Sequence, residues 1–296
     1  MDNRREVREF LASRRARLTP QQAGLPAWGG SRRVPGLRRE EVALLAGVSI
    51  DYYTRLERGD LRGVSDTVLD AIANALRLDE AERTHLGNLA KAAQTSGRRP
   101  RERAKPAGVR PELQRILDAV TEAPAYLRNG RRDILAANRL GRALYAPMYA
   151  SPARPVNVAR FIFLDPLAHD FFLDWTTAAR DMVAALRIEA GRTPHERALS
   201  DLVGELTTRS AEFAGIWASQ NVRFHRSGLK DVHHPGVGDL HLTFEAMELP
   251  ADPGLSLIVY SAEPGSASDD GLRLLASWAT TRAEQAHPAE SMPRDQ

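Results

Sequence analysis

One stretch, Arg38 to Gly59, constrains the fold of this chain more than any other. Its hydrophobic spacing predicts two helices over residues 39–46 and 49–58, joined by a tight turn at Gly47. The apolar side chains expected on the inward faces of this pair are Val42, Leu45, Val48, Tyr52 and Leu56. The pair is therefore expected to dock on a small helical domain.

The outward face of the second helix carries Asp51, Arg55 and Arg58, a polar and partly basic surface suited to a DNA major groove. Arg55 can bind guanine through two hydrogen bonds, with a surface salt bridge as the alternative. Asp51 either accepts from a cytosine amino group or caps the helix and pairs with Arg55. Ser49 is placed both to cap the helix and to reach DNA.

Charge is distributed unevenly along the 296 residues. Residues 1–108 contain 21 Lys and Arg against 14 Asp and Glu, and the rest contains 20 against 24. A basic front and an acidic back favour a polyanion partner at the front only, although the arginine-rich composition of a GC-rich genome is an alternative cause.

The sequence lacks cysteine and long apolar segments, and both absences narrow the class of protein. There is no cysteine, which excludes disulfides, thiolate metal sites and a cysteine nucleophile. Apolar runs are short and MDNRREVREF has no signal-peptide core, so a cytoplasmic protein without membrane association is expected.

The N-terminal third predicts a helical DNA-binding domain over residues 1–94. A helix over 4–18, with arginines on its outer side, precedes a turn-rich loop over 19–36. Arg32 and Arg33 in this loop are candidates to touch phosphates or a minor groove, with a solvated surface loop as the alternative. Ser65 and Asp79 are expected to cap two more helices. Residues 95–108 form a basic linker or a solvated spacer.

Residues 109–285 predict an α+β domain, and residues 286–296 a polar tail. Asn129-Gly130 is a strong hairpin signal between two short strands. In residues 240–245, Leu240, Leu242 and Phe244 alternate with polar residues, as in a half-buried strand. The expected helices cover 111–122, 138–149, 166–190, 196–208, 210–219 and 272–280, with a compact apolar run at 161–164 and strands at 125–127, 133–137, 222–225, 229–234, 239–249 and 255–260.

The segment PGLRREEVALLAGVSIDYYTRLERG, followed by VLDAIANAL, resembles the helix-turn-helix of XRE-family (Cro/C1-type) transcriptional regulators. APAYLRNGRRDILAANRLGRALY, FLDP and HHPGVGDLHLTFEAMELP resemble the MmyB-like ligand-binding domain that follows in some of these regulators. The resemblance covers residues 4–280. It implies a multidomain chain, with an all-α five-helix lambda-repressor-like DNA-binding domain followed by an α+β PAS-like ligand-binding domain. It also implies a homodimer on a double-stranded DNA operator.

By position, the resemblance implies that Arg39 holds a phosphate and Arg62 reaches the DNA backbone. Ser49, Ile50, Asp51 and Arg55 would face the bases, and Tyr52 completes the expected DNA-binding set. Two departures from the family pattern stand out. The sequence DLRGVS follows Gly59 where Arg and Pro are frequent, and Ala137 replaces a residue that is commonly Trp, which implies a differently shaped pocket or core.

The resemblance further implies a small lipophilic ligand, such as a fatty-acid-like molecule, in the second domain. Aromatic residues concentrated there would line a pocket and a few polar residues would orient a head group, with ordinary core and structural roles as the alternatives. The expected ligand-binding residues are Asn138, Phe161, Phe163, Trp175, Arg180, Trp217, Phe224, His225 and His234.

Other functions receive less support from the sequence. Four histidines lie within residues 225–241, but His233 and His234 are adjacent and would point to opposite faces of a strand. No HExxH, GxSxG, Walker A or GxGxxG pattern occurs. We therefore expect a ligand-responsive repressor that has no cofactor, no metal and no catalytic role. The alternatives are a small-molecule-binding enzyme or metal-binding domain with an accessory DNA-binding head, and a module in which the helix pair binds protein.

Overall fold

The structure, a computed structural model, describes residues 2–25, 36–95, 109–220 and 227–286. The chain forms two compact units: residues 1–102 with 180–224, and residues 103–179 with 225–296. The division falls within helix α11 (Trp175–Arg192), so part of the sequence expected in the second domain belongs to the first unit. The domain boundaries expected at residues 94, 108 and 285 stay predictions.

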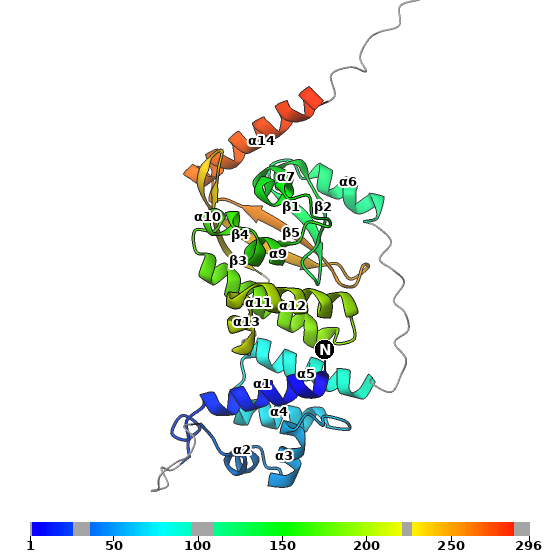
Figure 1. Ribbon diagram of the computed structural model, residues 1–296, viewed down its shortest axis with the longest axis vertical. Helices are drawn as coiled ribbons and strands as arrows, with labels where there is room; N and C mark the ends of the chain where they lie inside the picture. The colour runs from blue at the N-terminus through cyan, green and yellow to red at the C-terminus, as the bar shows by residue number, and fades with distance from the viewer. Residues whose placement is uncertain (1, 26–35, 96–108, 221–226, 287–296) are drawn as a thin grey trace, which may run out of the picture. The chain divides into compact units, whose positions relative to one another are not determined.

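The N-terminal helices of the first unit lie close to where the sequence places them (Figure 1). Side-chain oxygens of Ser49, Ser65 and Asp79 accept hydrogen bonds from backbone N–H groups in the first turns of the three helices that follow them, as expected of N-caps. The helices are α1 (Asn3–Arg17), α2 (Arg39–Leu45), α3 (Ile50–Glu57), α4 (Asp66–Ala75) and α5 (Glu80–Thr95).

One of the residues predicted to face the core of these helices does not do so. Val42 and Leu56 are fully buried as expected, but Leu45 is 36% exposed. Tyr53, which lies three residues before Leu56, is fully buried. The reason is geometric: α2 is short and buries Val42 and its neighbouring alanines, while the turn at Gly47 rotates α3 so that residues 53 and 56 face inward.

Three more helices complete the first unit: the C-terminal part of α11, α12 (Arg197–Arg209) and α13 (Ala211–Ala218). Ile188 of α11 packs against the core formed by the N-terminal helices. Gly191 approaches α5 so closely that a Cβ there would lie 2.7 Å from the His85 ring. These helices are thus built into the same packed body as α1 and α5.

The second unit contains a five-stranded antiparallel sheet in the order β2-β1-β5-β4-β3 (Figure 1). The predicted hairpin at Asn129-Gly130 and the alternation in residues 240–245 are confirmed, because Leu240, Leu242 and Phe244 are buried and the residues between them are exposed. The strands are β1 (Ala125–Asn129), β2 (Ile134–Ala137), β3 (Ser227–His234), β4 (Gly238–Glu248) and β5 (Leu255–Ser261).

Helices cover both faces of this sheet. Leu117 of α6 (Pro111–Ala119) packs with Leu127 on one face, while α14 (Ala267–Ala286) packs on Leu240 on the other. The apolar run at 161–164 belongs to a helix, and Pro147 lies in the first turn of a helix, where its missing N–H is not needed. The short helices are α7 (Arg139–Leu144), α8 (Ala146–Ala150), α9 (Val158–Leu164) and α10 (Leu167–Phe171). No helix of the described ranges has both the length and the apolarity needed to cross a bilayer.

Candidate nucleic-acid interface and ligand pocket

Helix α3 presents the surface that the sequence predicts for DNA recognition. The Ser49 Oγ accepts a hydrogen bond from the Tyr52 N–H at 3.2 Å, which fixes the start of the helix. Ile50, Asp51 and Arg55 are exposed. An apolar side chain, an acceptor and a guanidinium therefore share one accessible face at the N-terminal end of the helix.

Arg55 is oriented by an aromatic ring. Its guanidinium carbon lies 4.8 Å from the centre of the Tyr52 ring, while Tyr52 itself packs against the core of the unit. Among the described residues, Arg55 makes no ion pair with Asp51, so the salt-bridge alternative is not what this structure contains. Stacking holds the guanidinium plane while its N–H groups stay available to an acceptor.

The flanking arginines expected at phosphates are each held by a carboxylate. Arg39 pairs with Glu57 at 2.9 Å, and Arg62 pairs with Asp60 at 2.9 Å. Glu57 is buried and also binds Arg15, so it anchors Arg39 at the foot of α3. Both arginines remain about half exposed or more. Arg32 and Arg33 lie outside the described residues, and the DNA contacts of this set stay predictions.

The second unit contains a largely apolar pocket of about 980 Å³. This volume lies within the range of small-molecule sites. Its walls come from α7 and α8, α10, the turn after β3, and α14. The residues that define it include Ala143, Pro147, Leu167, Phe171, His234, Leu275 and Trp278.

Asn138 does not face this pocket with free polar atoms. Its Oδ1 accepts from the N–H groups of Ala125 and Gly141 at 3.0 and 2.7 Å. Its Nδ2 donates to the carbonyls of Val120 and Ala123 at 2.6 and 2.7 Å. With the amide fully engaged, Asn138 ties the start of α7 to β1, which is a structural role.

The other predicted ligand residues are scattered. Phe161 and Phe163 are buried in α9, and the Trp175 Nε1 donates to the Ile162 carbonyl at 2.9 Å. Arg180 is exposed, and Trp217 belongs to the first unit. Phe224 and His225 lie outside the described residues.

His234 is the one member of the predicted ligand set found on the pocket wall among the described residues. Its Nε2 donates to the Ala143 carbonyl at 3.1 Å, and its Nδ1 accepts from the Gly236 N–H at 3.1 Å. Burial lowers the pKa of His234, which favours this neutral form. Both ring nitrogens therefore already have partners within the protein.

Sequence reasoning missed the part of the pocket that α14 supplies. Leu275 and Trp278 of this helix line the pocket, and Trp278 is 44% exposed. A tryptophan three residues after a buried leucine in a terminal helix was the available signal. It was hidden because most of the aromatic residues in 161–175 pack in the core, and of these only Phe171 reaches the pocket wall.

Two of the clustered histidines pair with aspartates on the exposed surface of the sheet. His233 lies 2.6 Å from Asp239 and His241 lies 2.9 Å from Asp231, both pairs joining neighbouring strands β3 and β4. His234 points to the opposite, buried face, as the strand period requires. The described part of the chain contains no group of three or more side chains able to hold a metal ion.

Comparison with known families now decides what class of protein this is. Residues 6–86 match the model of a helix-turn-helix domain, and residues 109–275 match the model of the MmyB-like transcription regulator ligand binding domain. The chain belongs to the MmyB-like family of transcription regulators. It is a helix-turn-helix DNA-binding regulator with a ligand-binding domain, and both matched families are regulator domains. The comparison with curated proteins gives no match.

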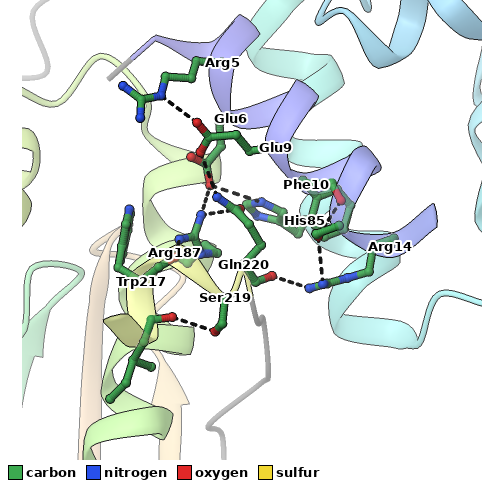
Figure 2. Close-up of polar contacts among 12 residues, drawn as sticks. Arg5, Glu6, Glu9, Phe10, Arg14, His85, Arg187, Trp217, Ser219 and Gln220 are labelled. Carbon is green, nitrogen blue, oxygen red and sulfur yellow. Dashed lines mark hydrogen bonds and ion pairs between the residues drawn. The ribbon is translucent and has the colours of Figure 1, made fainter. Parts of the chain in front are cut away.

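A buried polar network connects α1 with residues from the sequence that matches the ligand-binding domain (Figure 2). Arg187 of α11 donates to the Glu6 carboxylate on α1, to the Gln220 side-chain oxygen at 2.6 Å and to the Trp217 carbonyl. Arg187 is fully buried, and its guanidinium lies 4.1 Å from the centre of a Trp217 ring. Every residue of this network belongs to the first unit.

The same network extends along α1. Arg14 donates to the Gln220 carbonyl and pairs with the buried carboxylate of Glu82 at 2.9 Å. Burial lowers the pKa of Arg14 to about 10, so it stays charged at neutral pH. Burial and the charges of Arg187 and Arg14 lower the pKa of His85 to about 3, so its ring is neutral. The prediction that the arginines of α1 lie on its outer side is thus wrong for Arg14, which is buried.

Proposed function

We propose that this regulator is a repressor that binds its operator as a homodimer through α3 and is controlled by a small lipophilic ligand. The observation that carries the DNA-binding part is the outward face of α3, with Arg55 stacked on Tyr52 beside exposed Asp51 and Ile50. Two heads on one face of the duplex would read half-sites about one helical turn, roughly 34 Å, apart.

The pocket in the second unit supports the lipophilic ligand. Its volume of about 980 Å³ and its alanine, proline, leucine and aromatic walls suit an apolar molecule. The five-stranded antiparallel sheet with helices on its faces supports the PAS-like expectation for this domain. A fatty-acid-like molecule is the ligand class that we propose.

Helix α11 is the element through which we propose that the ligand-binding domain acts on the DNA-binding head. The helix begins among the residues of the second unit, with Trp175, and ends among those of the first, where Arg187 and Ile188 enter the packed body of the head. We propose that ligand binding in the second unit acts on the head through this continuous helix. Such control needs only a difference in ligand affinity between two states.

The DNA-binding proposal is tested by replacing Arg55 with Ala in the full-length protein. We expect binding to the DNA upstream of its own gene to weaken by about 1–3 kcal/mol, with relaxed preference at one base position. Arg8→Ala is the matched control, because Arg8 is an exposed arginine on α1 and removes the same charge. Fluorescence anisotropy at two salt concentrations measures both variants. Equal affinity and selectivity for Arg55→Ala and the unmodified protein would show that α3 does not read DNA.

The ligand and the sign of regulation are tested separately. Native mass spectrometry of the purified regulator is expected to reveal a co-purifying apolar molecule. A reporter under the upstream promoter is expected to rise when the regulator is deleted. A fall in the reporter would show activation instead of repression.

A further inference from the structure

Ile50 is an apolar side chain that the core of the first unit does not use. It is the first residue of α3 and is 52% exposed. Tyr53 and Leu56 of the same helix are fully buried, whereas Ile50 is not among the described side chains that form or border this core. Its apolar surface is therefore available to a partner outside the chain.

Exposure alone does not identify a binding residue, because single apolar side chains are common on protein surfaces. Ile116 of α6 is 54% exposed, and Leu44 of α2 is 73% exposed. Ile50 differs in its position, since it lies at the N-terminal end of the second helix of a helix-turn-helix, the end whose side chains contact base edges. The first helix of such a pair, which here carries Leu44, crosses the DNA backbone instead. Of the three residues, Ile50 is the one placed to meet bases.

The start of α3 is held in one conformation. Gly47 has a φ of 66°, and the N–H of Val48 donates to the Ala43 carbonyl at 3.0 Å, which closes the turn between α2 and α3. Ser49 then caps α3 with its side-chain oxygen. Isoleucine is β-branched and has one strongly preferred rotamer in a helix. The methyl groups of Ile50 therefore have a defined place and lose little conformational freedom when they are covered.

The bases differ in what they offer to such a side chain. In the major groove, guanine, adenine and cytosine present hydrogen-bonding atoms, and thymine also presents a methyl group at C5. Packing isoleucine over hydrogen-bonding atoms would leave them without water and without a partner, which is unfavourable. The thymine methyl is the base-edge group that Ile50 can cover without this penalty.

The charged neighbours of Ile50 on α3 support the same distinction. Asp51 is exposed, and its carboxylate only accepts hydrogen bonds, so it disfavours the O6 and N7 acceptors of guanine at this end of the helix. A T·A pair offers the methyl group and, on its adenine, an amino group that can donate to such a carboxylate. Arg55, stacked on Tyr52 one turn further along, carries the donors that suit guanine.

We propose that Ile50 determines the operator specificity of this regulator by packing on the C5 methyl group of a thymine. This inference rests on the proposed role of α3 in reading DNA and names the base that the first residue of the helix requires.

The test uses a duplex that the unmodified full-length protein selects from a random-sequence library. Each thymine in turn is replaced by deoxyuridine, which removes only the C5 methyl group, and fluorescence anisotropy measures the affinity. At one thymine position we expect the affinity to fall about fourfold, the change for one buried methyl-sized group. Ile50→Ala should bind the thymine duplex more weakly and should not distinguish thymine from deoxyuridine at that position.

A rescue experiment isolates the methyl group from the rest of the base. Cytosine in place of the responding thymine should weaken binding by the unmodified protein. Replacing this cytosine with 5-methylcytosine should recover about fourfold in affinity, because it returns a methyl group to the same edge of the base. Ile50→Ala should show no such recovery.

Two variants are matched controls. Ile116→Ala truncates an isoleucine of nearly the same exposure outside the helix-turn-helix, and Leu44→Ala truncates an exposed leucine on α2. Both should keep the full response to deoxyuridine. Ile50→Ala replaces an exposed side chain with a better helix former, so its thermal midpoint should not fall.

The outcomes separate this inference from the proposal on which it rests. A response to deoxyuridine that is equal in Ile50→Ala and in the unmodified protein overturns the inference, as does the absence of any responding thymine. The reading role of α3 then stands if Arg55→Ala still weakens binding. Failure to select any duplex, or an Arg55→Ala protein with unchanged affinity and selectivity, overturns the reading role and this inference together.

Discussion

Whether an arginine can be buried in this protein depends on carboxylates that lie far away in the sequence. Arg14 and Arg187 are both buried, against the usual tendency of charged residues to face water. Each finds a buried carboxylate, Glu82 for Arg14 and Glu6 for Arg187, which offsets the loss of hydration. Arg128 is also buried, and none of the carboxylates that the structure describes forms an ion pair with it.

His85 makes the stability of the first unit depend on pH. Its pKa falls from 6.5 to about 3, because burial and the charges of Arg187 and Arg14 oppose its protonation, with the Glu6 carboxylate 4.0 Å away. Between these two values the unfolded chain binds a proton that the folded chain does not, so stability falls as the pH decreases below about 6.5. We expect a loss on the order of 2 kcal/mol between pH 6.5 and 5.0.

Urea unfolding at pH 7.5, 6.5 and 5.0 measures this slope. His85→Leu is the comparison, because leucine has a similar volume and does not titrate. The slope between pH 6.5 and 5.0 should be smaller in His85→Leu by about the amount assigned to the histidine. An unchanged slope would assign the pH dependence to other groups.

Helix α11 is shared between the two compact units. Its first residues belong to the second unit and its last residues to the first, where Ile188 and Gly191 contact the core and His85. Gly191 permits this close approach because it has no side chain. The packing of α11 on α5 is therefore sensitive to a single methyl group.

Gly191→Ala tests that packing. The added Cβ would lie 2.7 Å from the His85 Nδ1, so α11 or the ring must shift, and we expect destabilisation of about 1–3 kcal/mol by urea unfolding. Gly204→Ala on α12 is the matched control, because a Cβ there meets no atom within 4 Å. Alanine favours helix over glycine, so the control should gain up to about 1 kcal/mol. Equal effects at the two positions would mean that α11 is not closely packed on α5.

For the whole molecule, the first unit is discontinuous in sequence: a DNA-binding head completed by helices from the ligand-binding region. Removing Arg187 would leave the buried Glu6 carboxylate without its partner. This arrangement implies that the head is most stable when residues 180–224 are docked.

Arg187→Met in the full-length regulator measures this dependence. We expect amide hydrogen exchange to rise in α1 and α5 but not in the strands of the second unit, since breaking a buried pair destabilises by about 3–5 kcal/mol. Adding Glu6→Gln should restore part of the protection by removing the unpaired charge. Arg197→Met, at a highly exposed position on α12, is the control. Unchanged exchange in α1 would contradict the proposed docking.

Much of the candidate site could be predicted where the information is local. Helical spacing and capping residues located α2 and α3 to within about a residue, and the placement of Arg55 on the exposed face followed from the same period. The hairpin at Asn129-Gly130 and the inward face of β4 followed from turn chemistry and a period of two. The ligand pocket did not, because aromatic content does not say which rings meet one another and which border empty space.

The sequence by itself determined the helix pair α2–α3, the cap of α3, the alternation in β4 and the family of the regulator, since each depends on neighbours within a few residues or on a continuous motif. Only the tertiary structure decided that Tyr53 replaces Leu45 in the core, that Asn138 is fully hydrogen-bonded, and that α11 completes the DNA-binding head. The physical reason is that burial and charge compensation depend on contacts between distant segments. Glu6 and Arg187 are 181 residues apart, and no local pattern marks them as partners.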